Sequence, residues 1–192
     1  MEKEMKKRGA FCLFWGVVCA LILLQSNKAV CAGPAEQVPA AKFTIPAPDS
    51  AQAQKYLGLK AMEPFGIPDI KASLVVVEFM SALCPHCHAN APILNNIFKT
   101  IQSDSRLADV KVIAIAVGSE KPELEAYIKK FKVPFPVFLD DDSSISVAME
   151  GVPTPTTMII ATENGKVLFS HTGVIQDPDQ FLKQLKALHK KK

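Results

Sequence analysis

An apolar run rich in β-branched residues, at 74–79, leads almost directly into the sequence Cys84-Pro85-His86-Cys87. Such a run, with Glu78 as its only charged residue, is typical of a β-strand that is buried on both faces. The residues after the cysteine pair favour a helix to about Gln102, because apolar side chains recur along one helical face. These are Ala91, Leu94, Phe98 and Ile101. The cysteine pair is therefore expected where a buried strand turns into a helix.

The rest of the chain alternates between strand and helix patterns. Strands are expected at 110–117, 136–139, 156–161 and 166–171, and helices at 122–131, at 142–149 and from 178 onward. Asn164-Gly165 separates the last two strands and is a strong hairpin signal. Asp177 is a predicted helix N-cap, because Pro178 and Gln180 follow it in a capping pattern. This order predicts an α/β fold, with a central mixed β-sheet and helices on both of its sides.

Residues 1–32 have the features of a signal peptide. Lys3, Lys6, Lys7 and Arg8 precede an uncharged, mostly apolar stretch at 10–24. That stretch is short for a transmembrane helix but suits the apolar region of a signal peptide. Val30-Cys31-Ala32 predicts cleavage before Gly33, and an uncleaved membrane anchor is the alternative. Export to the periplasm, or to another extracytoplasmic space where disulfides persist, is therefore expected.

The organisation of the remaining chain follows from its composition. Residues 33–50 contain four prolines and several alanines without a sustained period, which predicts an extended linker. Residues 51–192 then suit a single domain. The leader carries five of the 22 Lys and Arg and two of the 19 Asp and Glu, which leaves 17 of each. The chain without its leader has no net charge, so the composition does not favour nucleic acid as a partner.

The number and positions of the cysteines indicate which reaction the chain can perform. Three of the five cysteines (Cys12, Cys19 and Cys31) lie in the leader, so only Cys84 and Cys87 remain after cleavage. A lone Cys-x-x-Cys pair at a helix start indicates thiol–disulfide exchange, because the helix dipole stabilises a thiolate there. His86, when protonated, adds a second positive charge, and Pro85 is compatible with a helix start. Cys84 is expected to be the attacking sulfur and Cys87 the resolving one.

These motifs together resemble the thioredoxin superfamily. The segment 77–87 is similar to the active-site region of the DsbA family of periplasmic disulfide oxidases, and Pro92 matches the proline inside the thioredoxin active-site helix. The segment 152–157, Val-Pro-Thr-Pro-Thr-Thr, resembles the cis-proline loop. Cys84 and Pro155 are 71 residues apart, which resembles the TlpA-like periplasmic thioredoxins. Their thioredoxin-like fold has an extra strand–helix insertion, here expected to include Lys111 to about Phe131.

The resemblance also implies roles for individual residues. Pro155 is the expected cis-proline, with Pro153 as the competing candidate, and Thr154 is expected to offer its backbone to an extended substrate segment. Glu78 matches the buried acid that relays the proton of the resolving cysteine, so its pKa should be raised by burial. Leu83 stands where the family often has tryptophan before the first cysteine.

Alternative functions for the same residues remain open at this point. Cys84-Pro85-His86-Cys87-His88 also fits the c-type haem attachment pattern, with His88 as the axial ligand. A peroxiredoxin is disfavoured, because Val77 and Ser81 replace the proline and threonine expected before its reactive cysteine. A zinc or copper site is disfavoured as well, because ligands on one short turn do not readily enclose a metal.

The favoured function is an exported protein thiol–disulfide oxidoreductase that needs no cofactor or metal. Its expected partners are proteins with cysteines and an upstream redox protein in the membrane or periplasm. The chain itself would contact the membrane only if its N-terminal segment is not cleaved. Whether it oxidises or reduces its substrates is left open by the sequence, because the thiolate-stabilising motif and the TlpA-like spacing favour opposite directions.

Overall fold

The structure is a computed structural model that describes residues 43–190. The predicted signal peptide, with Cys12, Cys19 and Cys31, lies outside the described residues, as does the predicted linker up to residue 42. Within residues 43–190, no helix is long and apolar enough to cross a membrane.

Strand β1 (Leu74–Met80) lies at the centre of a five-stranded sheet with the order β3-β2-β1-β4-β5. All seven residues of β1 are buried, as the apolar run predicts. The other strands are β2 (Val110–Ala116), β3 (Val137–Leu139), β4 (Thr156–Ala161) and β5 (Val167–Thr172). β1, β2 and β3 are parallel, whereas β4 is antiparallel to both β1 and β5, so the sheet is mixed as expected.

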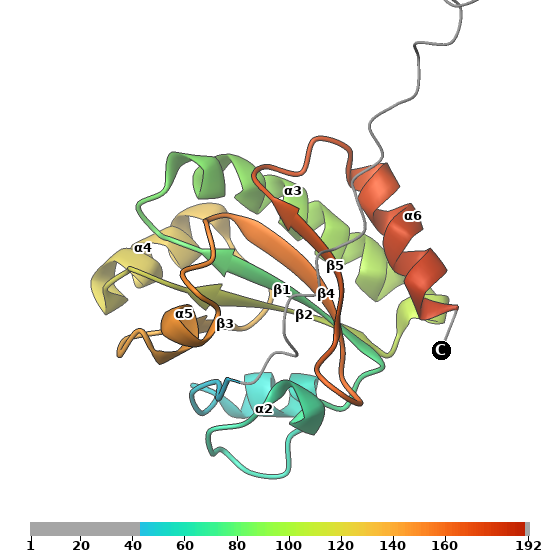
Figure 1. The fold of residues 1–192 in the computed structure, drawn as a ribbon, viewed down its shortest axis with the longest axis horizontal. Coiled ribbons are helices and arrows are strands. Elements are labelled where there is room, and N and C mark those ends of the chain that lie inside the picture. Colours follow the sequence, from blue (N-terminus) through green and yellow to red (C-terminus); the bar gives the residue numbers. More distant parts are fainter. Residues whose placement is uncertain (1–42, 191–192) are drawn as a thin grey trace, which may run out of the picture. The chain divides into compact units, whose positions relative to one another are not determined.

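Helices cover both faces of this sheet (Figure 1). They are α2 (Ala51–Leu57), α3 (Pro85–Ser103), α4 (Lys121–Phe131), α5 (Ser144–Ala148) and α6 (Pro178–His189). Side chains of α3, α4 and α6 pack into one apolar cluster with alternate residues of β1, and those of α2 and α5 pack into a second cluster on the opposite face. The predicted α/β class, with a central mixed sheet and helices on both of its sides, is confirmed.

Strand β2 and helix α4 occupy the range of the expected insertion, Lys111 to about Phe131, and the short edge strand β3 and helix α5 follow them. Because β3 pairs in parallel with the end of β2, it extends the sheet on the side away from β4.

Residues before position 51, the expected start of the domain, also pack against the sheet. Phe43 and Ile45 are buried in the second apolar cluster, and Ile45 forms an antiparallel bridge with Phe65. The two backbone hydrogen bonds of this bridge measure 2.7 and 3.0 Å. The folded domain therefore includes residues 43–50, because their apolar side chains cover a sheet face that water would otherwise reach.

Tyr56 of α2 completes the edge of the sheet beyond the end of β3. Its hydroxyl accepts a hydrogen bond from the backbone N–H of Val112 at 2.9 Å and donates to the Val112 carbonyl at 3.4 Å. β3 pairs only with Ala114–Ala116, so Val112 has no strand partner on that side. Burial raises the pKa of Tyr56 to about 12, which keeps the hydroxyl proton available for this bond.

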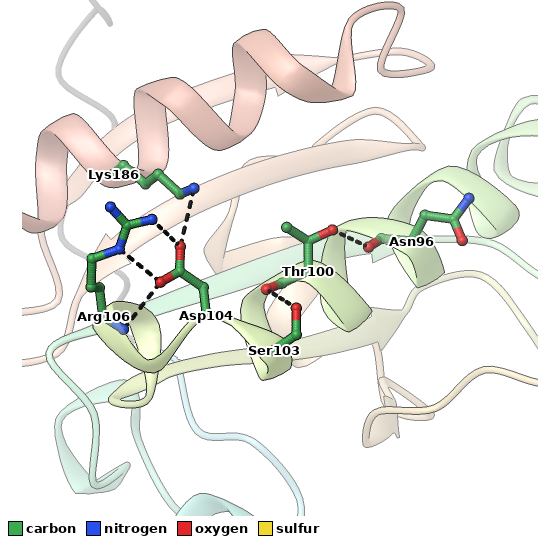
Figure 2. A network of polar contacts seen from close by, with 6 residues as sticks. All are labelled: Asn96, Thr100, Ser103, Asp104, Arg106 and Lys186. Atoms are coloured by element: carbon green, nitrogen blue, oxygen red, sulfur yellow. Dashed lines mark hydrogen bonds and ion pairs between the residues drawn. The ribbon is translucent and has the colours of Figure 1, made fainter.

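An ion-pair network lies at the C-terminal end of α3 (Figure 2). The Asp104 carboxylate accepts hydrogen bonds from the Arg106 guanidinium at 2.8 Å and lies 3.1 Å from Nζ of Lys186 on α6. These contacts hold the pKa of Asp104 well below its ordinary value, and the hydrogen bonds from Arg106 have the largest effect. Positive side chains near a helix C-terminus are favourable. Figure 2 also shows the hydrogen-bonded residues of the last turns of α3: Asn96, Thr100 and Ser103.

Candidate active site

The cysteine pair lies where β1 turns into α3. Cys84 is the N-cap of α3, and Pro85 is the first residue of the helix. A backbone N–H at this position has no partner within the helix, so proline, which lacks the N–H, costs no hydrogen bond there. The backbone N–H of Cys84 donates to the carbonyl of Ser81 at 3.1 Å, and that of His88 donates to the carbonyl of Cys84 at 3.1 Å. These bonds fix the turn, and they place both cysteines at the positive end of a 19-residue helix, as predicted.

The two thiols have different surroundings. Both are free in this structure, and Cys84 is partly exposed whereas Cys87 is buried. Sγ of Cys84 lies 3.5 Å from the backbone carbonyl oxygen of Thr154. Sγ of Cys87 points inward, where it accepts a hydrogen bond from the backbone N–H of Ser81 at 3.4 Å. Cys84 is thus the thiol that a large substrate can reach.

These surroundings move the two thiol pKa values in opposite directions. Burial tends to raise the pKa of Cys84, but hydrogen bonds from the Cys87 backbone and the Thr154 side chain outweigh it, so the pKa is lowered. Burial raises the pKa of Cys87 to about 12, although the Ser81 N–H opposes this change. A thiolate therefore forms more easily at Cys84 than at Cys87.

The loop before β4 approaches the cysteine pair from another part of the chain. The Thr154–Pro155 peptide bond is cis, which confirms Pro155 rather than Pro153 as the cis-proline. Pro155 is buried, and its carbonyl accepts a hydrogen bond from the backbone N–H of Gly173 at 2.8 Å. The loop is thereby tied to the end of β5, with Thr154 beside Cys84.

Glu78 lies on β1 beneath the cysteine pair and is only 2% exposed. Its Oε1 accepts a hydrogen bond from Nδ2 of Asn90 on α3 at 2.7 Å. Burial raises the pKa of Glu78 to about 7, against the opposing effect of the Asn90 hydrogen bond. The sequence-based expectation of a buried acid with a raised pKa is confirmed, and such a group can accept or release a proton near neutral pH.

The two histidines of the motif lie in different places. His86 is exposed, and its backbone, together with that of Cys87, contributes to lowering the pKa of Cys84. Nε2 of His88 lies 2.7 Å from the carbonyl oxygen of Ala82. The His88 ring also packs against two aromatic rings of α4, those of Tyr127 and Phe131, at centroid distances of 5.6 and 5.1 Å.

Two residues of the site were missed by sequence reasoning. Asn90 is fully buried and contacts Glu78, and the hydroxyl of Tyr127 donates to the carbonyl of Cys87 at 3.1 Å. Asn90 lies three residues after Cys87 and four before Leu94, so helical spacing could have placed it on the buried face of α3. No local signal connects Tyr127 to Cys87, because the two residues are 40 positions apart.

Within the described part of the chain, no group of three or more His, Cys, Asp or Glu side chains is arranged to hold a metal ion. The ionisable groups of the site are two thiols of unequal acidity and a buried carboxyl group.

The chain is similar to several known redox proteins. It is 32% identical to the thiol-disulfide oxidoreductase ResA of Bacillus subtilis over 111 residues, which are 58% of this chain and 59% of ResA. It is 27% identical to the sporulation thiol-disulfide oxidoreductase A of the same organism over 108 residues, 55% of this chain and 62% of that protein. The chain thus spans less than two thirds of the length of each of these relatives.

Solved structures support the same fold. The crystal structure of StoA from Bacillus subtilis matches with a TM-score of 0.57 at 21% identity, covering 77% of this chain and 99% of StoA. A thiol:disulfide interchange protein of the thioredoxin family from Chlorobium tepidum matches with a TM-score of 0.58 at 22% identity, covering 81% and 98%. The likeness of the motif to DsbA finds no support in these proteins.

The sequence profile of the AhpC/TSA family matches residues 39–170, which include the cysteine pair, the insertion and the cis-proline loop. This match agrees with the thioredoxin-like sheet and with the redox proteins above. The chain therefore belongs to the AhpC/TSA family and is a TlpA-like member of the thioredoxin superfamily.

Proposed function

We propose that this protein is a thiol–disulfide oxidoreductase that exchanges disulfides with cysteine-containing proteins through Cys84 and Cys87. The observation that carries the proposal is the inequality of the two thiols. Cys84 is partly exposed and has a lowered pKa, whereas Cys87 is buried and has a raised pKa. An accessible thiolate paired with a protected thiol suits exchange through a mixed disulfide. The names of the relatives support the same activity.

In the direction that reduces the substrate, the proposed exchange has two steps. The Cys84 thiolate attacks one sulfur of a substrate disulfide, which forms a mixed disulfide and releases a substrate thiolate. Cys87 then loses its proton to Glu78 and attacks Sγ of Cys84. This second step releases the other substrate thiolate and leaves Cys84 and Cys87 joined in a disulfide, so the substrate gains the two electrons that the protein loses. The opposite sequence of steps oxidises a substrate dithiol.

The substrate in this proposal is an extended protein segment that docks beside Thr154. Leu83, the residue before Cys84, is 64% exposed and adds an apolar contact next to the reactive sulfur. A backbone contact at Thr154 is independent of the substrate's side chains, so it suits a protein that acts on several sequences.

The proposed site of action is the periplasm or another extracytoplasmic space. The support for this location is the sequence of residues 1–32, which has the pattern of a signal peptide. A redox protein in that compartment would then restore the state of the Cys84–Cys87 pair. The direction of the reaction follows from the reduction potential of the pair relative to that protein.

Neither haem attachment nor peroxide reduction is proposed. Axial ligation by Nε2 of His88 would break its contact with Ala82 and move its ring out of the aromatic packing against α4. Val77 stands where a peroxiredoxin is expected to have proline before its reactive cysteine. It is buried in the cluster on the opposite face of the sheet from Glu78 and Cys87, so it lies away from the resolving thiol.

Substitution of each cysteine tests the proposal. The Cys84→Ser variant should lose exchange with a protein disulfide, because the attacking sulfur is gone. The Cys87→Ser variant should accumulate a mixed disulfide at Cys84, visible as a covalent adduct by mass spectrometry. Equal activity of the two variants would refute the assigned roles. The reduction potential measured against glutathione then decides the direction, since a value near that of thioredoxin would exclude the oxidase.

A further inference from the structure

Asn90 is a fully buried polar residue that joins three elements around the cysteine pair. It lies on α3, its Nδ2 donates to Oε1 of Glu78 on β1 at 2.7 Å, and its Oδ1 accepts from the backbone N–H of Ile175 at 3.0 Å. Ile175 lies in the connection between β5 and α6. A buried amide without partners is costly, so both of these bonds matter for its orientation.

The contact with Ile175 determines which end of the amide faces Glu78. A backbone N–H can only donate a hydrogen bond, so it must meet the amide oxygen of Asn90. The amide nitrogen is then turned toward Glu78, where it can only donate. The carboxyl group consequently always faces a donor, and a donor favours the ionised carboxylate.

We propose that Asn90 is a positioning residue for the resolving step, because the Ile175 backbone holds its amide as a fixed donor that makes Glu78 able to accept the proton of Cys87. This inference rests on the proposed thiol–disulfide exchange. It adds a residue that does not touch the reacting sulfurs and acts through Glu78.

The groups that face Glu78 are consistent with this role. The titratable ones are Cys87 on α3 and Tyr127 on α4, and both are affected by the charge of Glu78. Its partners across the neighbouring strands, Ala114 and Thr157, are uncharged. Asn90 is therefore the group placed to favour the Glu78 carboxylate, and its hydrogen bond opposes the burial that raises the Glu78 pKa to about 7.

Loss of the Asn90 donor should raise the pKa of Glu78 further. Glu78 would then hold its own proton over a wider pH range, and it would accept the proton of Cys87 only at higher pH. The attack by Cys84 on a disulfide should change less, because the hydrogen bonds that lower its pKa come from the backbone of α3 and from Thr154. The expected result is a change in the pH dependence of the resolving step.

The experiment uses the full chain with Asn90→Leu, alone and combined with Glu78→Gln. A mixed disulfide with glutathione is formed at Cys84, and the release of glutathione by Cys87 is followed from pH 5 to pH 9 by rapid mixing. Asn90→Leu should move the midpoint upward by about one pH unit and slow release at pH 7 about fivefold, because the ionised fraction of Glu78 falls from about one half to about one eleventh. In the Glu78→Gln background the same substitution should change the rate less than about twofold.

The control is Asn96→Leu, the same substitution at an exposed position of the same helix. It should leave the pH profile of glutathione release unchanged. An equal effect of Asn90→Leu with and without Glu78 would overturn the inference, because it would show a purely structural role. The absence of any effect with Glu78 present would overturn it as well.

A second measurement does not depend on whether the Asn90 variant folds. In the wild-type protein, the Nδ2 proton resonances of Asn90 should shift with the same midpoint as the Glu78 carboxyl carbon, and they should not titrate in Glu78→Gln. Asn90 resonances that stay constant while Glu78 titrates would refute the contact. Failure of the proposed function would look different, because wild-type Cys87 would then not release glutathione at any pH.

Discussion

Replacing Glu78 with Gln should make the folded protein more stable above neutral pH. It should also remove the contribution of Glu78 to the pH dependence of the free energy of unfolding. Glu78 is buried, and its pKa is raised from 4.5 to about 7. Glutamine has almost the same shape, carries no charge at any pH and keeps an oxygen that can accept the hydrogen bond from Asn90. The substitution therefore removes the titration while it retains the packing.

The sign of the effect follows from the two pKa values. Between pH 4.5 and about 7, the folded protein keeps the Glu78 proton and the unfolded chain loses it, so the free energy of unfolding falls as the pH rises. The stability associated with the protonated group is fully present below pH 4.5 and is lost as the pH rises through about 7. A shift of this size corresponds to about 3 kcal/mol.

The assay is urea denaturation of the reduced protein at a series of pH values from 4 to 8. Both thiols are present in wild type and in Glu78→Gln, so the comparison of the two proteins isolates the contribution of Glu78. The stability of Glu78→Gln relative to wild type should increase by about 3 kcal/mol from the lowest to the highest pH. Glu125→Gln, at an exposed position of α4, is the matched control. Parallel pH curves for wild type and Glu78→Gln would refute the reasoning.

Three further substitutions test contacts outside the thiols. Tyr56→Phe should lower the free energy of unfolding by about 1–2 kcal/mol, because the backbone N–H of Val112 loses its acceptor. Tyr127→Phe should cost about 1 kcal/mol, because the carbonyl of Cys87 loses the hydrogen bond from the Tyr127 hydroxyl. Denaturant titration checks both, and no loss in either variant would contradict the assigned bonds. Because the Asp104 pKa is lowered, its ion pairs stabilise the protein above the ordinary carboxyl pKa and are lost as the pH falls. The destabilisation by Asp104→Asn should therefore shrink in high salt or acid, and an effect independent of both would exclude an electrostatic origin.

The features that could be predicted from the sequence are those with a local cause. The apolar run of β1 requires burial wherever it lies, Asn164-Gly165 specifies a tight turn, and Asp177 caps α6 through a hydrogen bond from Gln180, three residues away. The cis-proline was expected from the resemblance to the thioredoxin superfamily, and the Thr154–Pro155 peptide bond is cis.

The features that could not be predicted depend on contacts between distant segments. Phe43 and Ile45 lie in a proline-rich stretch without periodicity, and only the uncovered sheet face explains their burial. His88 completes a haem-attachment pattern in the sequence, yet the fold places it against Ala82 and the rings of α4. The bond between Asn90 and Glu78 connects a helix to a strand, so its existence depends on how α3 crosses β1.

The different roles of the two thiols were expected from the sequence, but the opposite shifts of their pKa values depend on contacts between distant segments. A helix N-terminus lowers the pKa of nearby thiols, so the Cys-x-x-Cys motif by itself favours thiolates at both positions. The structure separates them because Cys84 faces the Thr154 loop, whereas Cys87 faces the core above Glu78. In the proposed exchange, the burial that raises the Cys87 pKa to about 12 protects the resolving thiol until a mixed disulfide forms. A carboxyl group with a pKa of about 7 then takes its proton, so the residues that position Glu78 should affect the second step of exchange more than the first.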